Sequence, residues 1–147
     1  MLSENLKILL ATSYAFVIKA QNFHWNIEGS NFPQYHEFFE NLNREVYENA
    51  IDRTAEYIRT LEAYTPGSIA RYAELSLIPD QLKIPRAELM FAEQYSDNEK
   101  IIAHLKVCYD SCEESEHYGI SNFIAERIDA HNKHQWMIRS TLKTNRE

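Results

Sequence analysis

The amino-acid sequence predicts an all-α domain built as a four-helix bundle. Apolar residues recur three, four and seven positions apart in four long stretches, which is the period of an amphipathic helix. The 147 residues include only three glycines and four prolines, too few for a protein of many short strands and turns. With 44% hydrophobic and 25% charged residues, the chain has the composition of one globular domain, expected over residues 1–147.

The first helix is predicted from about Ser3, a residue type that caps helix N-termini, to about Gly29. Its apolar stripe consists of Leu6, Leu9, Leu10, Phe16, Val17, Ala20 and Phe23. Pro33 opens the second helix, where a missing N–H loses no partner. That helix is expected to end near Tyr64, because the sequence Thr-Pro-Gly-Ser follows it.

The third helix is predicted from Pro85 to about Glu116, and the fourth from about Ser121 to about Leu142. Gly119 is expected to break the chain between them. The connection is therefore short, as it is between the first two helices. Each pair should form a hairpin of antiparallel helices.

A connection of about twenty residues joins the two hairpins, and its middle, from Ile69 to Ser76, predicts a short extra helix. Such a connection is long enough to cross the bundle lengthwise. Two helical hairpins joined by one long crossover form the ferritin-like arrangement. The predicted fold class is therefore an all-α, ferritin-like four-helix bundle with a short extra helix in the crossover.

The formal net charge of −7 favours cations as partners over DNA, RNA or an anionic membrane. The apolar run from Ile8 to Val17 follows Glu4 and continues with a helical period, so we interpret it as helix and not as a targeting segment. No stretch approaches the ~20 apolar residues of a membrane span. Cys108 and Cys112 make no disulfide framework, and a cytoplasmic location is expected.

Five residues on the first two helices could bind a metal. His24 and His36 lie near the hairpin that joins these helices, so both imidazoles can approach one point, and imidazole suits iron and zinc. Glu40 lies one turn after His36, and Asp52 and Glu56 form a second one-turn pair. Taken alone, each histidine is better explained as an ordinary structural residue, and each acidic pair as a solvated helix face.

Geometry limits how these residues combine. Sixteen residues separate His36 from Asp52, which in a straight helix is roughly 24 Å of rise and about 160° of rotation. One chain cannot place both groups on the same ion. A site that uses all of them needs two chains that meet antiparallel across a two-fold axis. The sequence therefore favours a metal site between subunits.

The sequence offers little for a site inside the bundle. Ordinary ferritins build their di-iron centre there from Glu-x-x-His motifs on two helices. This chain has one such spacing, from Glu114 to His117, in a polar context typical of a surface. His131 and His134 could chelate a transition metal, but we interpret them as part of a solvated or packing face. A monomeric bundle enzyme with an internal di-iron site is therefore disfavoured.

Four further residues are expected to have packing roles. Cys108 and Cys112 are predicted to be small core or semi-buried residues. Trp25 and Trp136 are also predicted to pack, and a role in quenching radicals near the metal site is an alternative for them.

Most of the chain resembles the Dps family, the miniferritins. The motif His-Trp-x-x-x-Gly at residues 24–29, with a second histidine twelve residues after the first, is specific. The other similar stretches are residues 31–37, 52–59, 65–68 and 124–137.

This resemblance implies a hollow twelve-subunit shell that oxidises Fe(II) at sites shared between two-fold partners. Hydrogen peroxide is usually the preferred oxidant in the family, and ferric mineral collects inside. By position, His24 and His36 would bind iron from one subunit, and Asp52 and Glu56 from the other. Glu40 matches a position that is often a site carboxylate. Zinc could substitute for iron.

The chain departs from the family at one position of the second helix. The acidic pair usually lies one residue closer to the second histidine, and without that extra residue the matching positions hold Ile51 and Ala55. One inserted residue turns everything after it by about 100° in a regular helix. A π-bulge absorbs one residue within a turn and restores the face. We therefore predict a bulge between about Tyr47 and Ile51.

The sequence thus predicts a ferroxidase and iron-storage shell that protects against oxidative damage. The alternative is a Dps-like structural, DNA-binding or metal-binding shell with an impaired ferroxidase centre. DNA binding is expected to be weak or absent, because family members often bind DNA with a long Lys-rich arm. Here Lys7 is the first basic residue, and an acidic shell would oppose Lys143 and Arg146 at the other end.

Overall fold

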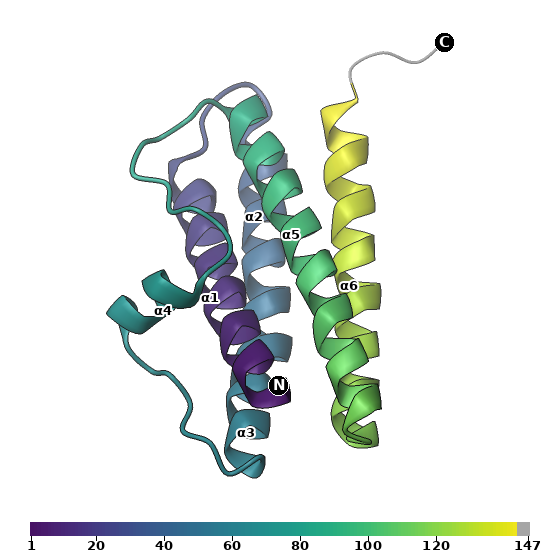
Figure 1. Ribbon diagram of the computed structural model, residues 1–147. Coiled ribbons are helices and arrows are strands. Elements are labelled where there is room, and N and C mark those ends of the chain that lie inside the picture. The colour runs from purple at the N-terminus through teal and green to yellow at the C-terminus, as the bar shows by residue number, and fades with distance from the viewer. Residues whose placement is uncertain (144–147) are drawn as a thin grey trace.

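The computed structural model describes residues 1–143, and these form the predicted ferritin-like four-helix bundle (Figure 1). The first hairpin consists of α1 (Leu2–Asn26) and a long helix in three parts. These parts are α2 (Phe32–Val46), a π-helical turn η1 (Tyr47–Ile51) and α3 (Asp52–Thr60). Pro33 lies in the first turn of α2, as expected.

The second hairpin consists of α5 (Ala87–Glu114) and α6 (Tyr118–Leu142), which run side by side in Figure 1. The crossover between the hairpins carries the predicted short helix α4 (Ile69–Leu75), which packs against α1. Ser68 caps α4 by accepting a hydrogen bond from the Arg71 amide at 3.3 Å. Within residues 1–143, no helix is long and apolar enough to cross a membrane.

The turn between α5 and α6 corrects the predicted boundary at Gly119. This glycine lies inside the first turn of α6, where the helix tolerates it. The chain reverses instead at Glu116, whose φ of +59° lies in the left-handed region. The His117 amide donates to the Cys112 carbonyl at 3.0 Å and closes the turn. Glycine is common where a helix ends in the left-handed conformation, so Gly119 suggested a helix end. The turn lies at Glu116 instead.

Aromatic side chains fill the core between α1, α2 and α5. Phe23 and Phe39 meet edge to face with ring centroids 5.6 Å apart, and Phe39 lies 4.7 Å from Phe91. All three rings are at most 2% exposed. Burying one such side chain contributes about 1.5–3 kcal/mol. Cys108 and Cys112 are fully buried, as predicted, and burial raises the pKa of these thiols to about 12 and about 11.

The predicted bulge is confirmed, since the π-helical turn η1 spans Tyr47–Ile51. Its effect is visible in the core-facing residues Val46, Ala50, Thr54 and Ile58, which lie four apart and are each at most 3% exposed. In a regular α-helix, three such steps would rotate the stripe by about 120°. The wider π-turn offsets about 100° of that rotation, and the helix keeps one face toward the core.

Charged side chains occupy the bundle interior as matched pairs. Arg127 on α6, 4% exposed, donates to both carboxylate oxygens of Glu45 at 2.6 and 3.0 Å. His134 also donates to Glu45. His131 donates from Nδ1 to the Asn98 side-chain oxygen at 2.7 Å and accepts from Arg127 at Nε2. His131 and His134 are therefore buried packing residues, one of the two alternatives expected for them.

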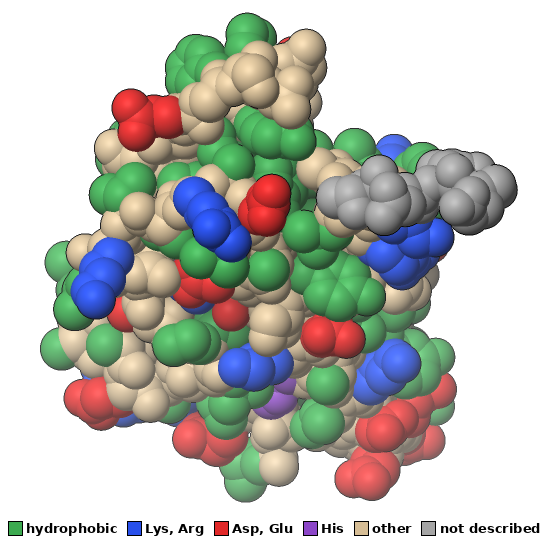
Figure 2. All heavy atoms as spheres, turned by 90° about the horizontal axis from the view of Figure 1, so that it is seen from above, with side chains coloured by type: hydrophobic (Ala, Val, Ile, Leu, Met, Phe, Trp, Pro, Cys, Tyr) green, Lys and Arg blue, Asp and Glu red, His purple; other side chains and the backbone are tan. Residues whose placement is uncertain are grey.

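Both tryptophans are largely exposed in the subunit, although a packing role was predicted for them. Trp25 is 64% exposed and Trp136 is 55% exposed. Each tryptophan lies on the solvent-facing side of its helix, outside the apolar stripe that faces the core. On the face shown in Figure 2, several acidic side chains gather at the lower right, and elsewhere acidic and basic side chains are scattered among apolar ones.

Removing the Glu45 carboxylate should destabilise the fold. Glu45→Ala leaves the buried Arg127 guanidinium without its anion, and breaking such a pair costs about 3–5 kcal/mol. Glu74→Ala is the matched control, since its pair with Arg71 is exposed and contributes at most about 1 kcal/mol. Denaturant unfolding of both variants measures the difference, and equal losses would contradict this role.

The Glu45–Arg127 pair also makes the stability of the fold depend on pH in the acid range. Partial burial alone would raise the pKa of Glu45, but hydrogen bonds from His134 and Arg127 and the Arg127 charge together lower it well below its usual value of 4.5. The stabilisation is therefore present above pH 4.5 and is lost as the pH falls from there toward the lowered pKa. The Glu45→Ala variant should lack this component of the acid transition.

Candidate metal centre

The two predicted histidines meet where α1 ends and α2 begins. His24 lies in the last turn of α1 and His36 in the first turns of α2, and their rings stack with centroids 4.0 Å apart and planes 19° apart. Phe32 stacks on the outer side of His36, with centroids 4.9 Å apart. The expectation that both imidazoles approach one point is confirmed.

The two imidazoles hold each other through the backbone. His24 donates from Nδ1 to the His36 carbonyl at 2.7 Å, and His36 donates from Nδ1 to the His24 carbonyl at 2.7 Å. The His24 carbonyl belongs to the last turn of α1, where carbonyls lack helical partners. The same hydrogen bond therefore completes the end of the helix and fixes the ring.

This exchange of hydrogen bonds uses Nδ1 of each ring and leaves Nε2 of each ring free. A carbonyl oxygen can only accept, so Nδ1 carries the hydrogen in both rings and Nε2 of each neutral ring presents a lone pair. Metal-binding histidines usually have this form, with the second nitrogen held by a carbonyl or carboxylate. We call His24 and His36 the histidine pair. Its chemistry suits Fe(II) or Zn(II).

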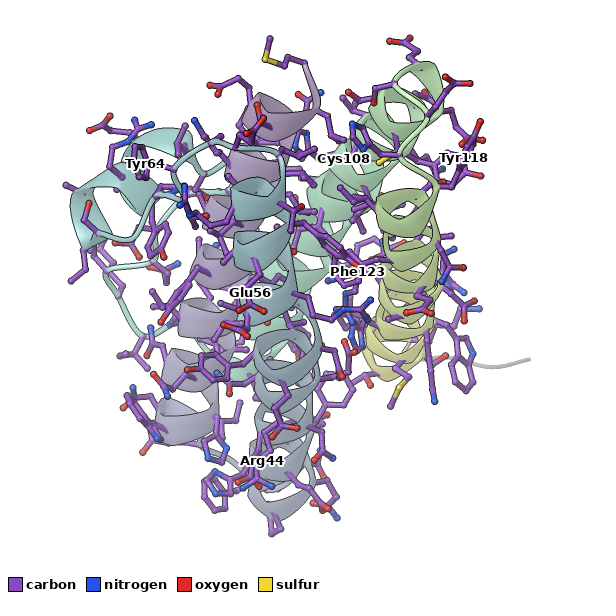
Figure 3. The ribbon with its side chains drawn as sticks, turned by 90° about the horizontal axis from the view of Figure 1, so that it is seen from below. Arg44, Glu56, Tyr64, Cys108, Tyr118 and Phe123 are labelled. Carbon is purple, nitrogen blue, oxygen red and sulfur yellow. The ribbon has the colours of Figure 1, made fainter. Side chains whose placement is uncertain are left out.

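The predicted carboxylates lie further along the same long helix. Asp52 is the first residue of α3, and Glu56 follows one turn later. Both are exposed, and within residues 1–143 neither makes a hydrogen bond or ion pair. We call them the acidic pair. Figure 3 shows Glu56 on this helix, some turns from Arg44 and facing away from the core.

Glu40 is held differently from the acidic pair. It lies one turn after His36 and is partly exposed, but its carboxylate is paired with Arg44 at 3.1 Å. Sequence reasoning missed this partner, although an (i, i+4) Glu–Arg spacing is a usual signal for one. Glu40 could bind a metal only by leaving Arg44.

A single subunit does not bring these groups together. Among the described residues, no three His, Cys, Asp or Glu side chains converge so as to hold a metal ion. The histidine pair and the acidic pair do not meet within the described subunit, in agreement with the 16 positions from His36 to Asp52. Within one described subunit, each pair therefore stands without the other.

The bundle interior, where ordinary ferritins hold their metal, contains paired cationic side chains in this chain. Arg127 lies between Glu45 and His131, and Lys19 forms a buried ion pair with Asp97 at 2.8 Å. Burial raises the pKa of Asp97, against the opposing effect of Lys19. Sequence reasoning missed both pairs, because a charged residue on an amphipathic helix does not reveal its partner. With Arg127 fixed among them, these interior groups are poorly suited to bind a cation.

The chain has clear relatives of known sequence. The family model of the ferritin-like domain matches residues 3–147. An uncharacterised low temperature-induced protein of Nostoc sp. is 31% identical over 136 residues, which cover 91% of this chain and 75% of that protein. DNA protection during starvation protein 2 of Bacillus anthracis is 30% identical over 124 residues, which cover 84% of each chain.

Solved structures agree with these relatives. The Dps protein of Vibrio cholerae O1, described as a member of a broad superfamily of ferritin-like diiron-carboxylate proteins, superposes with a TM-score of 0.92. It is 25% identical to this chain, and the match covers 97% of this chain and 89% of that one.

Deleting one exposed residue from the π-turn should be tolerated. Without Glu48, the core stripe of Val46, Ala50, Thr54 and Ile58 changes from spacings of 4-4-4 to 3-4-4, which a regular α-helix accommodates. We expect the melting temperature of the deletion variant to change by less than about 3 °C.

Deletion of the exposed Asn41 is the matched control, because it separates Phe39 from the stripe that follows and no bulge lies there to absorb it. This variant should lose roughly 10 °C or fail to fold. Similar melting temperatures for the two deletions would contradict the role assigned to the π-turn.

Proposed function

Since this chain belongs to the ferritin-like proteins and, within them, to the Dps family, we propose that it is a ferroxidase and iron-storage protein. Its subunits would assemble into a closed shell, twelve in the arrangement implied by the family, and two-fold partners would share each iron site. The shell would work in the cytoplasm and protect against oxidative damage by removing Fe(II) and peroxide together.

The observation that supports this proposal most strongly is the reciprocal hydrogen bonding of the histidine pair. Two imidazoles held through Nδ1, with ring centroids 4.0 Å apart, keep both Nε2 atoms available to a metal at no further ordering cost. The acidic pair has no competing partner among residues 1–143. An antiparallel approach of two chains would bring the histidine pair of one to the acidic pair of the other, because a two-fold interface uses the same surface twice.

The proposed reaction uses Fe(II) as substrate. The histidine pair and the acidic pair would bind Fe(II) through nitrogen and oxygen ligands, and Glu40 would join them after leaving Arg44. Hydrogen peroxide accepts one electron from each of two Fe(II) ions and takes up two protons, which yields two Fe(III) ions and two water molecules. Fe(III) then hydrolyses and collects as mineral in the cavity. Zinc, with the same ligand preferences, would compete for the site.

Mixed shells test whether two subunits share each site. Shells of only His36→Ala chains, or of only Asp52→Ala chains, should oxidise Fe(II) slowly with peroxide, as followed by ferric absorbance. In a random equal mixture, half of the two-fold pairs are mixed, and each mixed pair holds one intact site of two. The mixture should therefore recover about a quarter of the wild-type rate.

A mixture of His36→Ala with His24→Ala chains is the matched control, since neither chain supplies an intact histidine pair and no activity should return. Sedimentation first verifies that each sample is a large closed oligomer and not a 17.3 kDa monomer. Absence of recovery in verified mixed shells, or equal recovery in both mixtures, would favour a site within one chain. Slow oxidation by the wild type itself would favour the alternative of a shell with an impaired centre.

DNA binding is expected to be weak. The net charge of −7 opposes binding to a polyanion. At about 0.15 M salt, without bridging divalent ions, the Kd for duplex DNA should be no tighter than the range of about 10⁻⁴–10⁻⁶ M typical of non-specific binding. A gel-shift titration measures it, and nanomolar binding under these conditions would overturn the expectation.

A further inference from the structure

Three tyrosines form a connected row between the π-turn and the crossover helix. Tyr47 is the first residue of η1, and its ring meets the Tyr14 ring edge to face with centroids 6.4 Å apart. Tyr14, on α1, stacks on Tyr72 of α4 with centroids 4.8 Å apart and planes 17° apart. We call Tyr47, Tyr14 and Tyr72 the tyrosine row. It joins three elements that are distant in sequence.

One end of the tyrosine row lies one turn along the helix from the acidic pair. A π-turn closes between residues i and i+5, so Tyr47 stands one turn before Asp52. The other end lines an apolar groove of about 510 Å³ between α1 and α4, whose walls include Ile18, Ile69 and Ile78. The row therefore leads from the candidate metal centre into a sheltered place within the same subunit.

The tyrosine hydroxyls are free for proton release. Within residues 1–143, none of the three makes a hydrogen bond to another protein group. Tyr47 is 51% exposed, and the other two are partly exposed, so water reaches the row. Burial and the neighbouring Tyr14 raise the pKa of Tyr72, so this phenol keeps its proton at neutral pH and releases it only on oxidation.

We propose that the tyrosine row is a one-electron relay that serves the iron site and holds the resulting radical on Tyr14 and Tyr72. The proposal rests on the function proposed above. It applies when a site holds one Fe(II) ion, because peroxide needs two electrons. The ion gives one electron and the Tyr47 phenol gives the other, with its proton released. One peroxide, one Fe(II), one phenol and one proton become two waters, one Fe(III) and one phenoxyl radical.

The radical then moves along the row. Tyr14 passes an electron to the Tyr47 radical through the facing rings, while water carries the proton in the same direction, so Tyr47 is restored and Tyr14 becomes the radical. Tyr72 can then pass an electron to the Tyr14 radical in the same way, so that Tyr14 is restored and Tyr72 becomes the radical. After a second turnover, two radicals in the stacked pair couple. A carbon–carbon bond forms between ring carbons next to the hydroxyls, and each displaced ring hydrogen returns to its own oxygen.

The relay predicts a specific covalent product. Wild-type shell given one Fe(II) per site and an equal amount of peroxide should show a tyrosyl radical by electron paramagnetic resonance after freeze-quenching. Digestion and mass spectrometry should then find a cross-link between Tyr14 and Tyr72. Tyr14→Phe keeps the packed ring but removes the phenol, so this variant should lose the cross-link and most of the radical signal.

Tyr64→Phe is the matched control, since Tyr64 is 84% exposed and lies outside the row, and it should behave as the wild type. A second arm replaces iron and peroxide by a photochemical one-electron oxidant, a ruthenium tris-bipyridyl complex with persulfate. This arm tests the row without any iron chemistry. A purely structural role of Tyr14 predicts no difference between the two variants in either arm.

The two arms separate failure of the relay from failure of the proposed function. A Tyr14–Tyr72 cross-link in the photochemical arm, with no ferric absorbance in the iron arm, would show that the stacked pair can hold radicals, but it would overturn the ferroxidase and with it the relay that serves iron. Ferric absorbance without radical or cross-link in the iron arm would overturn the relay and leave the ferroxidase standing. Absence of the cross-link from the photochemical arm would also overturn the relay.

Discussion

The π-helical turn at Tyr47–Ile51 is the constraint on which the rest of the arrangement depends. The long helix of the first hairpin must bury Val46 and Ile58 on one face, although the residues between them fit no regular α-helical spacing. The wider turn keeps both residues in the core. It also decides where the residues after it point, so the position of the acidic pair on the surface follows from the packing of the core. Loss of that register would displace the core and the candidate metal centre together.

The polar groups of the bundle are of two kinds, those paired in the interior and those left with free ligand atoms on the surface. Those in the interior, such as Arg127 with Glu45 and Lys19 with Asp97, are already matched in charge and hold the helices together. Those on the surface, the histidine pair and the acidic pair, keep unused ligand atoms. Under the proposed function, iron chemistry at the surface would need a second subunit, so assembly and activity would become one requirement. A subunit that fails to assemble would have no complete site with which to generate oxidants.

The sequence was sufficient for the helices, because they depend on the spacing of apolar residues along the chain. The bulge followed from the resemblance to the Dps family, which revealed one extra residue before Asp52. The sequence was insufficient where a partner lies far away in sequence. The pairing of Arg127 with Glu45 spans 82 positions, and no local pattern announces it. Trp25 and Trp136 were expected to pack, yet a large apolar side chain can equally lie on a surface that only assembly would cover. The histidine pair could be placed near one point by topology, but the exchange of hydrogen bonds that fixes the two rings needed atomic positions.

The central claim is that iron binds between two subunits and not inside one. Crystals of the shell soaked with Fe(II) under anaerobic conditions would locate the metal directly by anomalous diffraction at the iron absorption edge. The account predicts anomalous peaks beside Nε2 of His24 and His36 in one subunit and beside the carboxylates of Asp52 and Glu56 of the partner subunit. Peaks within a single bundle near Glu45 and His131, with none at the histidine pair, would contradict it.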